Sequence, residues 1–323
     1  MLALLLAAQA AAPAYPPTPS AIVAAAKSGE WVTIASDDLL VMELAPDAAG
    51  HPRRVLIQLI AAPFARGWVA NIRTLARAHW YDGTAVTRVQ DNYVAQWGDP
   101  DGETAKAKPL PAGLRKTNED GYAVSQATHG LCDLDECDAY PQSVDRWLQR
   151  VSYGAFDARP GWAKGWPVAF ETSRRLDRTS RVEERIWPVH CYATVGVGRG
   201  LSPDTGSGAE LYVVIGQAPR HLDRNIAVVG RVVEGIENLS ALPRGTGALG
   251  VYATAGERTV VRSIRLASEL PVGERPRLQY LSTEGDSFAA YANARANRRD
   301  AFFVQPAGGV DVCNVPVPVR RAP

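Results

Sequence analysis

Four cysteines are the first residues of this sequence whose type and spacing could support chemistry: Cys132, Cys137, Cys191 and Cys313. An even number of cysteines in an exported chain favours disulfides, and four cysteines allow three pairings. Cys132 and Cys137 are close enough to close a small local loop, which would leave Cys191 to tie a strand to the C-terminal tail at Cys313. His129 with Cys132 and Cys137 is the alternative, a metal site. Their spacing is loose and no second cysteine pair lies near, so we expect no metal.

Other candidate motifs lack the context that their chemistry needs. The glycine-rich run at residues 196–200 ends a predicted strand without a following helix, which excludes a phosphate-binding loop. Ser207 does not lie in a nucleophile elbow, and the acidic run at residues 133–136 lacks the spacing of a calcium loop. The formal net charge of +1 gives no electrostatic reason to expect nucleic acid or an anionic membrane as a partner. We therefore expect no cofactor.

Arg88 is the most informative candidate because of the residues around it. It lies in the block YDGTAVTRV at residues 81–89, and QWGDP follows at residues 96–100. A second block, GAELYVVIGQAPRHLDRN, covers residues 208–225, with VGRVVEG following at residues 229–235. An arginine keeps its charge and presents several donors in a rigid fork, so it can polarise a substrate without a nucleophile.

The elements that must position these residues are mostly strands. Alternating apolar residues and turn signals predict strands at residues 39–44, 55–60, 86–89, 94–97, 192–197, 210–215, 227–233 and 259–266. Trp68, Ile72 and Leu75 share one face at helical spacing while Arg73 and Arg77 point away, which predicts a helix there. Short helices are also predicted near residues 235–242 and 287–298. Closing the strands into a barrel removes exposed edges, although the periodicity alone would also allow a sandwich.

The sequence divides into five parts. Residues 1–12 have the apolar run and Ala-x-Ala pattern of a secretory signal peptide, and residues 13–34 are expected to be a linker. The main domain is expected at residues 35–270, with an extension at residues 271–323. Residues 100–189 are turn-rich and contain four tryptophans among many arginines, so we interpret them as a long irregular insertion. We expect an exported protein, periplasmic in a Gram-negative cell, with no membrane span after the signal.

Both blocks resemble those of the cyclophilin family of peptidyl-prolyl cis/trans isomerases. VANIR at residues 69–73 is similar to the family's ENF helix, and the two blocks are similar to YDGTxFHRV with QGGDP and to GSQFFIxLGxAPHLD with VFGRVVEG. The resemblance covers residues 37–100 and 190–268, in family order. It implies a mainly β fold: a closed eight-stranded antiparallel barrel capped by two helices, with a peptide groove on its outer face.

The resemblance also implies roles for individual residues. Arg88 matches the catalytic arginine, and Gln96 matches the glutamine that supports it. The remaining matches line the proline pocket and the groove: Tyr93, Val94, Gly198, Glu210, Tyr212, His221 and Leu222. Several positions depart from the family pattern. Thr87 replaces histidine, Val86 replaces phenylalanine, and Glu210 replaces glutamine. If the Glu210 carboxylate faces Arg88, it would orient the guanidinium but offset its charge, so we expect reduced activity on standard peptides.

The implied chemistry needs neither a bond to break nor a cofactor. Rotation about an amide meets a barrier of ~18–20 kcal/mol, and X-Pro isomerisation takes tens of seconds or longer without help. A guanidinium that stabilises the twisted amide more than the planar forms would accelerate it. We therefore predict a monomeric isomerase that acts on proline-containing segments of unfolded or exposed polypeptides. The alternative is a weakly catalytic or non-catalytic cyclophilin-like module that binds such segments as a chaperone.

Overall fold

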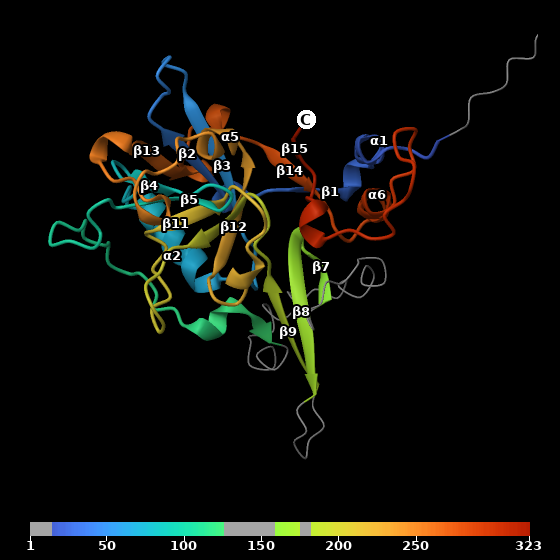
Figure 1. Cartoon of the computed structure of the whole chain (residues 1–323), viewed down its shortest axis with the longest axis horizontal. Helices are drawn as coiled ribbons and strands as arrows, with labels where there is room; N and C mark the ends of the chain where they lie inside the picture. The colour runs from blue at the N-terminus through green and yellow to red at the C-terminus, as the bar shows by residue number, and fades with distance from the viewer. Residues whose placement is uncertain (1–14, 126–158, 175–181) are drawn as a thin grey trace, which may run out of the picture.

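A closed eight-stranded antiparallel barrel forms the centre of the molecule. The computed structural model describes residues 15–125, 159–174 and 182–323 (Figure 1). The barrel strands are β2 (Leu39–Leu44), β3 (Arg53–Leu59), β4 (Ala85–Val89), β5 (Val94–Gly98), β10 (Thr194–Val197), β11 (Leu211–Val214), β12 (Val228–Glu234) and β13 (Thr259–Leu266). They are ordered β10-β11-β5-β4-β13-β2-β3-β12. The predicted strands and their closure into a barrel are both confirmed.

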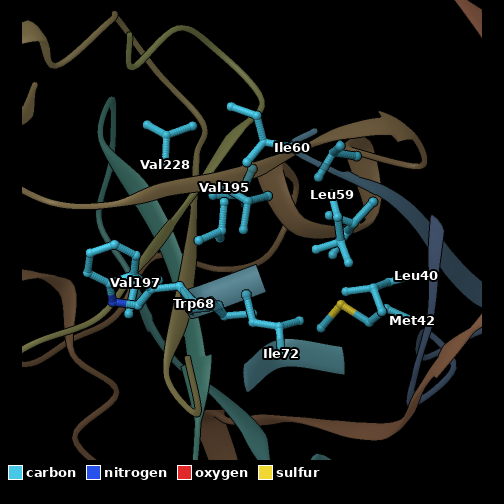
Figure 2. Close-up of a cluster of buried hydrophobic side chains, with 14 of the residues drawn as sticks. Leu40, Met42, Leu59, Ile60, Trp68, Ile72, Val195, Val197 and Val228 are labelled. Carbon is cyan, nitrogen blue, oxygen red and sulfur yellow. The ribbon is translucent and has the colours of Figure 1, made fainter. Parts of the chain in front are cut away.

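Alternating side chains fill the inside of the barrel, as the period of two in a strand requires. Leu40 and Met42 of β2 pack with Leu59 of β3 and Val195 of β10 (Figure 2). Helix α2 (Arg66–Arg77) adds its apolar face to this core, and its Ile72 is completely buried. A four-residue helix, α5 (Glu237–Ser240), follows β12. Two predicted helices of the barrel are therefore present.

The opposite face of α2 is polar, as its sequence predicts. Arg73 forms an ion pair with Asp38, and Arg77 lies 3.5 Å from the Asp37 carboxylate. These contacts orient the helix because its apolar face meets the barrel while its arginines meet the segment before β2.

The expectation that the insertion is irregular is confirmed for residues 100–123, whose only regular element is the short helical turn Glu119–Tyr122, but it is wrong for the described residues that follow. These form a four-stranded sheet, ordered β6-β9-β8-β7, from β6 (Val124–Ser125), β7 (Arg159–Ala163), β8 (Trp166–Arg174) and β9 (Val182–Pro188). Lys164 and Gly165 turn the β7–β8 hairpin with φ angles of 48° and 81°, as its two-residue loop requires. Val168 packs with the barrel and Ala169 with the C-terminal extension. Burial on both faces removes the apolar–polar alternation that would have revealed these strands.

The described residues towards the two ends of the chain form a third unit. Helix α1 (Pro19–Ala24) contacts α6 (Asp286–Ala296), and the strands β1 (Trp31–Thr33), β14 (Leu278–Leu281) and β15 (Val319–Arg321) form a sheet ordered β1-β14-β15. The part expected to be a linker thus contributes a helix and a strand. Figure 1 shows this blue and red unit beside the barrel, above the β7–β8 hairpin.

A disulfide joins Cys191, just before β10, to Cys313 of the extension. The predicted pairing of Cys191 with Cys313 is therefore confirmed. Cys132, Cys137 and His129 lie outside the described residues, so the local loop and the metal site stay predictions. Among the residues that the structure describes, no group of three His, Cys, Asp or Glu side chains is arranged to hold a metal. No helix in the described ranges has the length and apolar character that a bilayer crossing requires.

Candidate active site

A row of cross-strand partners on the outside of the barrel brings the predicted site together. Arg88 of β4 lies opposite Gln96 of β5, Gln96 lies opposite Tyr212 of β11, and Tyr212 lies opposite Gly196 of β10. Residues directly opposite one another in antiparallel strands point to the same face of the sheet. The pairing register shifts between Val86 and Arg88, so a local irregularity of β4 helps to aim the arginine.

Neutral acceptors hold the Arg88 guanidinium in place. Its Nε donates to the Leu249 carbonyl at 2.7 Å and its Nη1 to Gln96 Oε1 at 3.3 Å, while its Nη2 donates to Gln90 Oε1. These bonds use three of the five N–H donors of an arginine. Within the described part of the chain, the other two have no protein partner and Arg88 has no ion pair. The half-buried guanidinium can therefore donate to a bound substrate.

Glu210 meets Arg88 only through Gln96. Its carboxylate accepts a hydrogen bond from Gln96 Nε2, and the amide oxygen of the same Gln96 accepts from Arg88. The direct pairing considered from the sequence is therefore not formed. Gly198 makes room for this carboxylate, since a Cβ at position 198 would lie 2.7 Å from Glu210 Cγ. Because a carboxylate can only accept, Glu210 fixes the Gln96 amide with its oxygen towards the arginine.

An apolar cluster lies beside the guanidinium. Val94, Tyr212 and Val214 form its buried part, and Tyr93, Leu222 and Ile226 pack against them. The Arg88 guanidinium carbon lies 5.5 Å from the centre of the Tyr93 ring. The exposed His221 ring stacks on the Tyr93 ring, with 6.2 Å between the two ring centres. We call these six residues, together with His221, the proline cluster, after the pocket that the sequence resemblance implies.

Tyr212 contributes a ring to the proline cluster and keeps its hydroxyl away from solvent. Its Oη lies 2.8 Å from Nε2 of the buried His190. Burial raises the pKa of the Tyr212 phenol well above its usual value, with the nearby Tyr93 and Asp223 adding to the rise. The phenol is therefore neutral at physiological pH, and its hydroxyl is free to donate to the imidazole.

The comparison with protein families agrees with this geometry. The family described as cyclophilin type peptidyl-prolyl cis-trans isomerase/CLD matches residues 61–262, more than half of the chain. The chain belongs to the cyclophilin-type isomerase family. The matched span contains the barrel strands from β4 to β12, the described insertion sheet and all nine predicted site residues.

A solved structure supports the same fold. A cyclophilin from Hirschia baltica matches with a TM-score of 0.62 and 20% identity, over 90% of this chain and 97% of that one. A cyclophilin-type peptidyl-prolyl cis-trans isomerase from Cryptosporidium parvum gives a TM-score of 0.39 and 11% identity, over 71% of this chain and 96% of that one. Curated protein sequences gave no match. At 20% identity the first comparison shows a likeness of fold alone, and this likeness covers most of the chain.

The structure adds site residues that the sequence analysis missed. Gln90 and Leu249 hold the guanidinium, Val214 and Ile226 complete the proline cluster, and His190 holds Tyr212. Gln90 lies two positions after Arg88, directly beyond the end of β4, so its spacing could have indicated it. Leu249 contributes a main-chain carbonyl from 161 residues away, which no side-chain pattern can reveal. A cavity of about 280 Å³ lies elsewhere, between the barrel and the extension, and no residue of the arginine site lines it.

Proposed function

We propose that this protein is a peptidyl-prolyl cis/trans isomerase in which Arg88 acts on X-Pro bonds. The observation that supports this most directly is the position of the Arg88 guanidinium at the edge of the proline cluster, with donors left for a ligand. Catalysis at an X-Pro bond needs an apolar surface that binds the proline ring and a hydrogen-bond donor to the amide. The proline cluster and Arg88 provide these two features side by side.

The reaction follows from these two features. The cluster around Tyr212 and Leu222 binds the proline ring and leaves the preceding carbonyl free to turn. As the amide twists, its nitrogen loses conjugation and its lone pair becomes a hydrogen-bond acceptor. A free N–H of Arg88 then donates to that nitrogen, an interaction that is stronger in the twisted state than in either planar state. No bond is broken, so neither a nucleophile nor a cofactor takes part.

Proline-containing segments of exported polypeptides are the proposed substrates. The Cys191–Cys313 disulfide supports the choice of compartment, because disulfides persist in oxidising environments outside the cytosol. The open cluster rim, where Tyr93 and His221 are partly or fully exposed, suits a segment of extended chain.

An exchange experiment on a short X-Pro peptide tests the proposal. We expect the protein to accelerate cis/trans exchange measured by two-dimensional NMR. Arg88→Ala should lower kcat/KM about 100-fold or more, because it removes the donor to the twisted nitrogen. Arg88→Lys should also fail to restore the rate, since an ammonium lacks the planar fork that Gln90, Gln96 and Leu249 hold. Arg277→Ala, which removes an exposed arginine of the extension, is the matched control.

A binding module without catalysis is the second candidate, favoured by the Glu210 carboxylate beside Gln96. That carboxylate opposes the positive charge on which the reaction depends. Peptide binding by the wild-type protein, with exchange no faster than in buffer, would replace the enzyme proposal with this one.

A further inference from the structure

A completely buried histidine lies behind the proline cluster. The His190 side chain has no exposed surface, and both ring nitrogens have partners. Nδ1 lies 2.9 Å from Asp223 Oδ1, and Nε2 lies 2.8 Å from Tyr212 Oη. The carboxylate can only accept, so Nδ1 donates to Asp223, while Nε2 shares a hydrogen bond with the tyrosine hydroxyl. The imidazole thus links two residues of different segments.

Strand β11, through Tyr212, is the first of the two segments that His190 links. Tyr212 lies on β11 with its ring in the cluster, at the position where the family pattern has phenylalanine. A buried hydroxyl without a partner is costly, so this tyrosine ring is stable in place only while its hydroxyl is hydrogen-bonded to His190. Gly196 leaves room for the Tyr212 side chain, because a Cβ at position 196 would lie 2.4 Å from the Tyr212 hydroxyl oxygen.

The turn that ends at Asp223 is the second segment that His190 links. Asp223 follows Leu222 directly, and its Oδ1 also accepts the His190 main-chain N–H at 2.9 Å, while its Oδ2 accepts from Arg220. Both ends of the short helical turn Arg220–Leu222 are therefore tied down next to the cluster residues His221 and Leu222. His190 thus joins the floor of the cluster on β11 to its far wall.

We propose that His190 is a positioning residue that sets the shape of the proline cluster by holding Tyr212 and the Arg220–Asp223 turn together; this rests on the function proposed above. His190 is not a member of the proline cluster, and its side chain has no exposed surface through which to meet a ligand. It acts through the distance between the ring that forms the floor and the turn that forms the wall. Both its contacts are polar bonds with defined directions, so the spacing is fixed more narrowly than apolar packing alone would fix it.

Two substitutions separate the two side-chain contacts of His190. An asparagine can place its amide near the Nδ1 position, whereas a glutamine can reach the Nε2 position. His190→Asn should therefore keep the hydrogen bond to Asp223 and lose the hydrogen bond to the Tyr212 hydroxyl. The Tyr212 ring then moves so that its hydroxyl reaches another partner. We expect kcat/KM on the X-Pro peptide to fall about tenfold, mainly through KM. His190→Gln should lose less, since its amide oxygen can still accept from Tyr212.

The double variant H190N/Y212F is the decisive test. Phenylalanine needs no acceptor, so removing the hydroxyl should restore kcat/KM and KM to within about threefold of wild type. A variant that merely damages folding would not be rescued in this way. Ile264→Val, a conservative change in the barrel core, is the matched control for lost stability and should leave KM unchanged. Thermal midpoints of all variants are measured alongside.

The outcomes distinguish this proposal from the proposed function. Equal losses in His190→Asn and in the double variant, or no loss in either, would overturn the role of His190 while leaving the isomerase in place. If the wild-type protein binds the peptide without accelerating exchange, the enzyme proposal fails. The same set of variants then tests the pocket through the dissociation constant from NMR titration. A wild-type protein that neither binds nor isomerises the peptide would overturn both.

Discussion

Replacing Glu210 with glutamine should make this protein a faster isomerase. The substitution removes one negative charge near the site but leaves an oxygen that can accept the Gln96 hydrogen bond, so Gln96 still presents its own oxygen to Arg88. The twisted amide nitrogen carries a more available lone pair than the planar one, and a nearby carboxylate disfavours that state. The expected change is therefore a gain in kcat/KM.

The size of the gain follows from the distance. Gln96 separates the two charges, which implies roughly 7 Å between them once its two hydrogen bonds are counted. Two unit charges at ~7 Å interact by roughly 0.6 kcal/mol in water and about 2 kcal/mol at an effective dielectric constant of ~20. Glu210 is exposed, so the lower figure applies, and only part of it changes as the amide twists. We expect about 0.5 kcal/mol, which corresponds to roughly a twofold to threefold gain in kcat/KM.

The assay is the exchange rate of an X-Pro peptide at several salt concentrations. The gain should be largest at low salt and vanish near 1 M, where the screening length is about 3 Å. Glu210→Ala should show no gain, because it also frees the Gln96 amide. Glu274→Gln removes the same charge from an exposed site in the extension and is the matched control. An unchanged or lower rate for Glu210→Gln at low salt would refute the electrostatic reasoning.

Three further changes have defined outcomes. Gly196→Ala should lower the free energy of unfolding by about 1–3 kcal/mol and raise KM, because the new methyl group overlaps the Tyr212 hydroxyl; an unchanged KM would contradict this. Reducing the Cys191–Cys313 disulfide, which closes a loop of 122 residues, should cost about 3–5 kcal/mol in a urea titration, and no shift of the midpoint would count against it. Glu30 accepts bonds from the first turn of α6, chiefly from its serine hydroxyl, and these lower the pKa of its carboxyl below 4.5. Its stabilisation is therefore present above pH 4.5 and lost as the pH falls through the folded-state value, so the thermal midpoints of wild type and Glu30→Gln should differ at pH 7 and converge once the pH is below that value.

Local patterns in the sequence are strong where one face of an element meets the core. The eight barrel strands and α2 each show the period of their own geometry, so they could be found without a structure. The β7–β8 hairpin could not, because apolar residues such as Val168 and Ala169 are buried on its two opposite faces. Strand β1 was hidden for a different reason: three residues are too few for a period, and its partner β14 lies about 250 residues away.

The candidate site shows the same division. The two sequence blocks identify Arg88, Gln96, Tyr93 and Tyr212 because those residues lie within continuous segments. The bond from Arg88 to the Leu249 carbonyl depends on how a distant loop folds over β4, and no side-chain identity encodes it. The separation of Glu210 from Arg88 by Gln96 likewise depends on strand register, which pairs Gln96 with both Arg88 and Tyr212.

By itself, the sequence determined the eight strands, the family resemblance that implies a barrel, the central arginine and most residues of the proline cluster. Each of these depends on the order of residues within short segments of the chain. Only the tertiary structure decided how these residues are held. His190 lies 22 residues from Tyr212 and 33 from Asp223, on a segment whose own pattern is unremarkable. The role of His190 depends on three hydrogen bonds that form when β11 and the Arg220–Asp223 turn pack around its buried ring. The distances between these groups are set by the packing of the whole fold and not by their positions in the sequence.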